Sequence, residues 1–225
     1  MKMSIFFNLL NHRLLASFGV LALLFTLTLG SAQAVQVERV VSPGGIEAWL
    51  IQDPTNPVTT VKLSFRGGAA LDPVGKEGLA NFVASTLDEG AGDMDSSAFQ
   101  KALDDRSISL RFNSGRDTFR GSLKTLNKYR DDAFEYLRLA LNAPRFDADP
   151  LTRIRAQIVS GIMQKGEDPS TLASKSIFET AFKGHPYARE SDGTRDSVLS
   201  LTRDDMQTFV TQRLARDNLL IGVVG

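Results

Sequence analysis

Apolar and polar residues alternate over residues 61–66, where Val61, Leu63 and Phe65 are separated by polar side chains. A period of two is typical of a strand with one buried face, so the alternation predicts a half-buried strand over Val58–Phe65. Short apolar or alternating runs, bounded by turn-forming residues, predict five further strands. These are Val37–Val41, Glu47–Ile51, Ser107–Asn113, Thr118–Thr125 and Leu219–Val224.

A helical period replaces this alternation in Lys76–Leu87, where Leu79, Phe82, Val83 and Leu87 form one apolar face. Five further helices are predicted from the same kind of pattern. They are a helix from a Ser96 or Ser97 cap to about Arg106, then Asn127–Asn142, Pro150–Lys165, Pro169–Phe182 and Arg203–Leu214. This order of elements predicts an α+β fold, with a mainly antiparallel sheet of about five or six strands and helices packed on one face.

The first 34 residues have the pattern of a secretory signal peptide. Lys2 and Arg13 supply the positive charge, Leu14–Leu29 is the apolar run, and Ala32-Gln33-Ala34 is a small-x-small cleavage site. The alternative is a retained N-terminal membrane anchor, for which the apolar run is short. We expect cleavage after Ala34 and, in a bacterium, export of residues 35–225 to the periplasm.

Charge and cysteine content narrow the range of partners. The chain has 26 basic and 26 acidic residues, and cleavage after Ala34 removes two of the basic ones and none of the acidic ones. The mature chain is therefore slightly acidic and has no basic run, so a nucleic-acid partner is not expected. It has no cysteine, so an exported form must be held together by its hydrophobic core rather than by disulfides.

The segment Gly75–Thr86 resembles the zinc helix of the insulinase/pitrilysin metallopeptidases, the inverted zincins, whose signature is H-x-x-E-H. In this register Asn81 and Ser85 stand at the positions of the two histidine ligands, and Ala84 stands at the position of the catalytic glutamate. Two imidazoles four residues apart bind one zinc ion, and the glutamate activates the metal-bound water. An amide, a hydroxyl and a methyl group cannot do this.

Further segments resemble the N-terminal domain of the same family, in the same order. They are the approach to the zinc helix over Val58–Gly78, the His185-Pro186-Tyr187 segment and the final strand Asp217–Gly225. The third ligand of active members is a glutamate on a later helix, and Gly161 stands at that position. No acidic residue lies between Asp149 and Glu167. All three ligands and the general base are therefore missing.

The resemblance implies the fold of the mitochondrial processing peptidases and a catalytically inactive chain. Such members of the family pair with an active subunit and help to hold extended peptide, with zinc expected only in the partner. We expect residues 35–225 to be the N-terminal domain of a longer, two-domain subunit; the alternative is a natural end on a sheet strand. Two other functions stay open: a zinc endopeptidase with an unrecognised metal site, and a free-standing periplasmic peptide-binding module.

Other polar residues have simpler explanations than catalysis. His185 is the only histidine after the signal segment and is interpreted as a structural turn residue. Asp88 and Glu89 are interpreted as solvated charges, because adjacent helical residues point apart. The acidic residues that follow lack the spaced ligand loop of a calcium site: Asp93, Asp95, Asp104 and Asp105.

Overall fold

A computed structural model describes residues 36–225, of which Val37–Gly225 form one compact unit. The predicted signal peptide and the alternative membrane anchor both lie outside the described residues. Within residues 36–225, no helix combines the length and the apolar character needed to cross a membrane.

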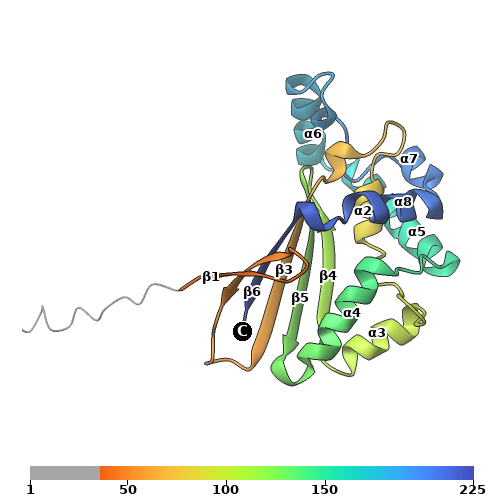
Figure 1. The fold of residues 1–225 in the computed structure, drawn as a ribbon. Coiled ribbons are helices and arrows are strands. Elements are labelled where there is room, and N and C mark those ends of the chain that lie inside the picture. Colours follow the sequence, from red (N-terminus) through yellow and green to blue (C-terminus); the bar gives the residue numbers. More distant parts are fainter. Residues whose placement is uncertain (1–35) are drawn as a thin grey trace, which may run out of the picture. The chain divides into compact units, whose positions relative to one another are not determined.

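Six strands form one mixed sheet in the order β1-β2-β6-β3-β5-β4 (Figure 1). Neighbouring strands are antiparallel except β2 and β6, which are parallel. The strands are β1 (Glu38–Val41), β2 (Glu47–Ile51), β3 (Val58–Arg66), β4 (Ser109–Ser114), β5 (Thr118–Leu126) and β6 (Leu219–Val224). The predicted strands are therefore confirmed to within about two residues at each end, which is the usual uncertainty of element boundaries.

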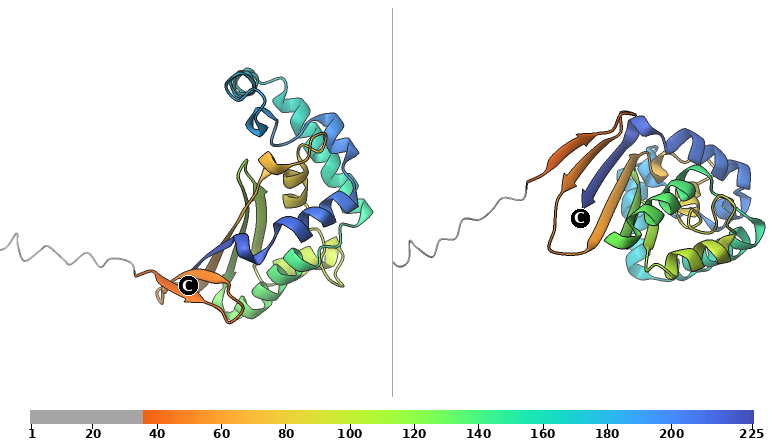
Figure 2. Two further views of the ribbon diagram at one scale, coloured as in Figure 1. Left: turned by 45° about the horizontal axis from the view of Figure 1, so that its top comes forward. Right: turned by 60° about the horizontal axis from the view of Figure 1, so that its bottom comes forward.

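The helices lie on one side of this sheet (Figure 2). They are α2 (Leu79–Ala84), α3 (Ser96–Asp104), α4 (Arg130–Asn142), α5 (Ala148–Lys165), α6 (Pro169–Ala181), α7 (Arg195–Ser200) and α8 (Arg203–Arg213). Short 3₁₀ turns cover Ala69–Leu71, Asn127–Tyr129, Pro186–Ala188 and Arg216–Asn218. The predicted α+β fold, mainly antiparallel with helices on one face, is confirmed.

The core lies between the sheet and these helices. Val61, Leu63 and Phe65 of β3 are buried, whereas Lys62 and Arg66, which alternate with them, are exposed. The alternation that predicted β3 therefore records which face of the sheet the helices cover. Residues from α2 and α8 are buried against the same face: Phe82, Val83, Met206 and Phe209.

Several boundaries were predicted wrongly for local reasons. Helix α2 begins after Gly78, whose φ of +89° stops it from extending back to Lys76, and it ends at Ala84 rather than Leu87. The cap of α3 is Asp95, which accepts from the N–H of Ala98, rather than Ser96 or Ser97. Strand β4 was predicted from Ser107 but begins at Ser109, because Ser107 has a φ of +53°. Helix α7, which begins with a Thr194 capping box, was not predicted.

Candidate functional site

Three of the four residues at the zinc-site positions belong to α2: Asn81 and Ala84 lie within the helix, and Ser85 is its C-cap. Asn81 and Ser85 are half-buried and one turn apart, and Ala84 is 3% exposed. The Ser85 hydroxyl donates to the carbonyl of Asn81 at 2.9 Å, so it is bonded to its own helix backbone. The side chains on this helix therefore offer one amide and one engaged hydroxyl where the family signature has two imidazoles.

The start of α2 is held by a buried carboxylate. The N–H groups of Gly78 and Ala80 donate to Asp72 at 3.1 and 3.2 Å, and Arg213 of α8 forms an ion pair with it. Burial raises the pKa of Asp72, while the Ala80 N–H, the Arg213 charge and the Gly78 N–H oppose this shift. Lys76, just before the helix, pairs with Asp205 of α8 at 2.8 Å. The start of α2 is therefore held in place by two ion pairs, Asp72 with Arg213 and Lys76 with Asp205, which lie outside the zinc-site positions.

Helix α5, which contacts α2, carries the fourth degenerate position. A Cβ atom added to Gly161 would meet nothing within 4 Å, so the position offers space and no ligand. Nearer the start of α5, the guanidinium of Arg155 lies 5.0 Å from the ring centroid of Phe82. It also donates to the carbonyls of Val198 and Leu201. Arg155 therefore connects α2, α5 and the end of α7 through hydrogen bonds and cation–π contact.

A zinc ion does not fit the residues at this site. Within residues 36–225, no three His, Cys, Asp or Glu side chains are grouped so that they would hold a metal ion. Zinc is bound in proteins by thiolate, imidazole and carboxylate groups, and none of these occurs at residues 81, 84, 85 or 161.

The two acidic residues after α2 were interpreted wrongly as solvated charges. Glu89 forms an ion pair of 2.5 Å with Arg153 of α5 and accepts from the Ser96 hydroxyl at 2.6 Å. Asp88 is half-buried, and this burial raises its pKa. The pairing across 64 positions could not be deduced from local sequence, because it depends on α5 packing beside α2.

The structure gives His185 a role in a turn. Its Nδ1 accepts from the N–H of Tyr187 at 3.2 Å, and the two rings lie 4.7 Å apart. Tyr187 in turn donates to Asp117 at 2.5 Å. Asp95 and Asp105 are also accounted for, the first as the cap of α3 and the second as the partner of Lys101.

One open edge of the described sheet lies beside α2. Within the described part of the chain, β4 pairs with β5 and with no other strand, and α2 contacts β4. An edge strand presents unpaired N–H and C=O groups, which an extended peptide can pair with. The zinc-site positions of α2 and the open edge at β4 are therefore neighbours.

Comparisons with known proteins place this chain in a family. The family model described as Insulinase (Peptidase family M16) matches residues 48–195. The chain belongs to the insulinase family.

Within the family its relatives include inactive members. It is 29% identical to a non-peptidase homolog, YmxG, of Helicobacter pylori over 75% of this chain and 39% of that protein. It is 20% identical to a probable mitochondrial-processing peptidase subunit beta of Arabidopsis thaliana over 81% of this chain and 34% of that protein. The chain thus spans well under half the length of these relatives.

Solved structures agree with the fold. A peptidase M16 inactive domain from Pseudomonas fluorescens matches with a TM-score of 0.80 at 25% identity, over 85% of this chain and 47% of that one. A protease from Helicobacter pylori has the same fold, with a TM-score of 0.76 at 19% identity, over 85% and 46% of the two chains. The names of the inactive domain and of the non-peptidase homolog agree with the prediction of a catalytically inactive chain.

Proposed function

We propose that this chain is part of a non-catalytic insulinase-family subunit that pairs with an active zinc metallopeptidase of the same family and helps to hold extended peptide substrate. Export to the periplasm, and zinc carried only by the partner, belong to the same proposal. The observation that supports it best is the well-ordered frame around α2. Asp72 and Arg213 hold the helix in place, although the side chains at Asn81, Ala84 and Ser85 have no peptidase chemistry.

Two further observations favour a role in binding. The edge of β4 lies beside α2, and addition of a strand to such an edge binds extended peptides through main-chain hydrogen bonds, whatever their side chains. Relatives at about 20% identity are named as processing peptidase subunits and, in Bos taurus, as subunit 1 of the cytochrome b-c1 complex. These names describe components of assemblies, which is the role proposed for this chain.

The test is reconstitution with an exported family member that retains H-x-x-E-H. The two purified proteins are mixed, complex formation is followed by sedimentation, and turnover of a fluorogenic peptide is measured. We expect a complex at micromolar concentrations and a higher rate than for the active subunit alone. The gain should come from substrate positioning, because this chain adds no catalytic group.

Two controls separate this function from the alternatives. This chain alone should not cleave the peptide, and a mixture in which the partner's signature glutamate is replaced by glutamine should also be inactive. Turnover in either control would favour a peptidase with its own metal site. Peptide binding by this chain, with no complex and no change in the partner's rate, would favour a free-standing peptide-binding module.

A further inference from the structure

The sheet face opposite the helices carries an uneven distribution of charge. We call this face the outer face; it consists of the strand residues that alternate with the buried ones. Strand register places six basic residues on it: Arg39, Lys62, Arg66, Arg111, Arg120 and Lys124. Among the described strands, its one acidic residue is Glu47, which Arg39 neutralises through an ion pair of 2.7 Å.

The five remaining cations of the outer face are exposed. In the part of the chain that the structure describes, none of them lies within 4.0 Å of a carboxylate; Lys62 donates instead to the Ser122 hydroxyl at 2.7 Å. The chain as a whole has equal numbers of basic and acidic residues. The outer face is therefore a local positive surface on a protein that is not basic, and it favours a negatively charged partner.

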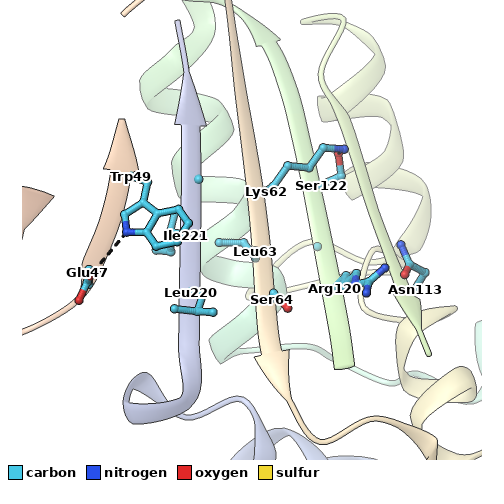
Figure 3. A pocket seen from close by; sticks show the side chains of 12 residues that line it. Glu47, Trp49, Lys62, Leu63, Ser64, Asn113, Arg120, Ser122, Leu220 and Ile221 are labelled. Atoms are coloured by element: carbon cyan, nitrogen blue, oxygen red, sulfur yellow. Dashed lines mark hydrogen bonds between the residues drawn. The ribbon is translucent and has the colours of Figure 1, made fainter. Parts of the chain in front are cut away.

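A groove runs across the middle of this face (Figure 3). Its volume is about 530 Å³, and its lining includes Trp49, Lys62, Arg120, Leu220 and Gly222. Gly222 of β6 pairs with Trp49 on one side and with Lys62 on the other. A Cβ atom at Gly222 would meet nothing within 4 Å. Because Gly222 has no side chain, a hollow lies between the indole of Trp49 and the ammonium group of Lys62. The backbones of these two residues are two strand spacings apart, or about 10 Å.

Two apolar side chains in the lining of the groove are strongly exposed to solvent. Trp49 is 56% exposed and Leu220 is 48% exposed. The indole N–H of Trp49 donates to Glu47 at 3.3 Å, which fixes the ring beside the hollow. Exposed aromatic and aliphatic side chains surrounded by charged residues are characteristic of interaction sites. The groove therefore combines an apolar centre with a cationic rim.

We propose that the outer face is a docking surface for an acidic segment of a partner protein, with one apolar side chain seated over Gly222 between Trp49 and Lys62. The apolar side chain removes the indole and Leu220 from water. Carboxylates on either side of it pair with Lys62 and Arg120. This surface lies on the face of the sheet, apart from the β4 edge of the proposed function, so either proposal can fail without the other.

Trp49 is the only tryptophan of the chain, so its fluorescence reports occupancy of the groove directly. The probe is a ten-residue peptide of glutamate and serine with one central leucine, titrated into the purified chain. We expect a saturable change in Trp49 emission as the peptide is added. The affinity of the peptide should fall sharply when salt is raised to 1 M, because the Debye length falls to about 3 Å. The same peptide with glutamine in place of glutamate should bind at least about tenfold more weakly.

Three variants test the surface. Lys62→Glu combined with Arg120→Glu should weaken binding about tenfold or more, because two attractions become repulsions. Gly222→Val should abolish the emission change by filling the hollow, and the room around Gly222 allows the fold to persist. The matched control for charge is Lys175→Glu combined with Lys183→Glu, on α6 and the segment after it. It changes net charge by the same amount and should bind as the unaltered chain does.

Three outcomes would overturn the proposal. One is equal binding of the acidic and glutamine peptides, and another is unchanged affinity in the Lys62→Glu, Arg120→Glu variant. The third is an emission change that follows protein concentration in the absence of peptide, together with a dimer in sedimentation. That result would assign the outer face to a second copy of this chain instead of an acidic partner.

Discussion

The guanidinium of Arg213 donates to the carboxylate of Asp72 at 3.1 Å, across 141 positions of the sequence. The side chain of Asp72 is completely buried, and that of Arg213 is 16% exposed. Arg213 also donates to the carbonyl of Leu71. The pair therefore joins the end of α8 to the loop that holds the first turn of α2.

Removal of the arginine should destabilise the fold strongly. In Arg213→Met the Asp72 carboxylate stays buried without its counter-charge, which costs about 3 kcal/mol or more. The expected result is a lower urea midpoint with an unchanged slope. Arg195→Met, which removes an exposed guanidinium, is the control and should change stability by less than about 0.5 kcal/mol. Equal stability of the two variants would contradict the role given to the pair.

The second prediction concerns the close contact between the backbones of Gly193 and Glu77. Gly193 has a φ of +84°, and a Cβ atom there would lie 2.3 Å from the carbonyl oxygen of Glu77. Gly184 has a similar φ of +80°, but its Cβ would meet nothing within 4 Å. Gly184→Ala should therefore cost about 1–2 kcal/mol for the left-handed backbone alone. Gly193→Ala should cost about 1–3 kcal/mol more, because the chain must also move.

Thermal unfolding of the two alanine variants measures this difference. Because both substitutions require an alanine at positive φ, the excess loss in Gly193→Ala reports the packing of Gly193 against Glu77. Similar losses in the two variants would show that this packing relaxes without cost.

Asp88 predicts a pH-dependent difference in stability. Burial raises the pKa of Asp88 above 3.8, the negative charge of Glu89 raises it further, and Arg111 opposes the shift. A carboxyl with a raised folded-state pKa contributes stability that is complete below the unfolded pKa and is lost as the pH rises through the folded value. Asp88→Asn should therefore be more stable than the unaltered chain at pH 7, and this advantage should disappear below about pH 3.8.

Urea unfolding between pH 3 and pH 7 provides the measurement. Asp104→Asn, on the exposed surface of α3, controls for the substitution of carboxylate by amide. An advantage of Asp88→Asn that is constant with pH would show that its cause is packing and not ionisation.

Restoring the H-x-x-E-H signature alone should not restore a peptidase. The triple variant Asn81→His, Ala84→Glu and Ser85→His still lacks an acidic ligand at Gly161, and three protein ligands are needed for a catalytic zinc. Ala84 is also 3% exposed, so the added carboxylate is costly to bury. We expect less than one zinc per chain after dialysis and no peptide turnover.

Addition of Gly161→Glu gives the matched comparison, because that position has room for a side chain. Zinc retained by the quadruple variant and not by the triple one is the expected difference. Stoichiometric zinc in the triple variant would show that a residue other than Gly161 already serves as the third ligand.

Much of the fold could be predicted from the local sequence. The alternation around Val61 and Leu63 located β3 and its buried face, and the helical period located α4, α5, α6 and α8 within a few residues. The boundaries were predicted wrongly where the conformation or the hydrogen bond of a single residue determines where an element begins. Ser107 adopts a positive φ that no pattern indicated, and Asp95 caps α3 in place of the neighbouring serines.

The site was harder to predict, because its contacts are distant in sequence. The identities of Asn81, Ala84 and Ser85 could be read directly, since a motif is a local feature. The ion pairs of Asp72 with Arg213 and of Glu89 with Arg153 could not, because each depends on two helices that meet only after folding. The charge of the outer face was also hidden, because it appears only when the strand register is known.

Strand β6 is the last strand in the sequence but lies third in the sheet, between β2 and β3. In the described structure, the β1–β2 hairpin joins the sheet through β6. A chain that emerges from N- to C-terminus therefore cannot complete its sheet until residues 219–224 are free to insert. Until then the β1–β2 hairpin cannot join the rest of the described sheet, and such long-range strand pairing is slow to form. The complete sheet therefore depends on the strand that is synthesised last of the six described strands.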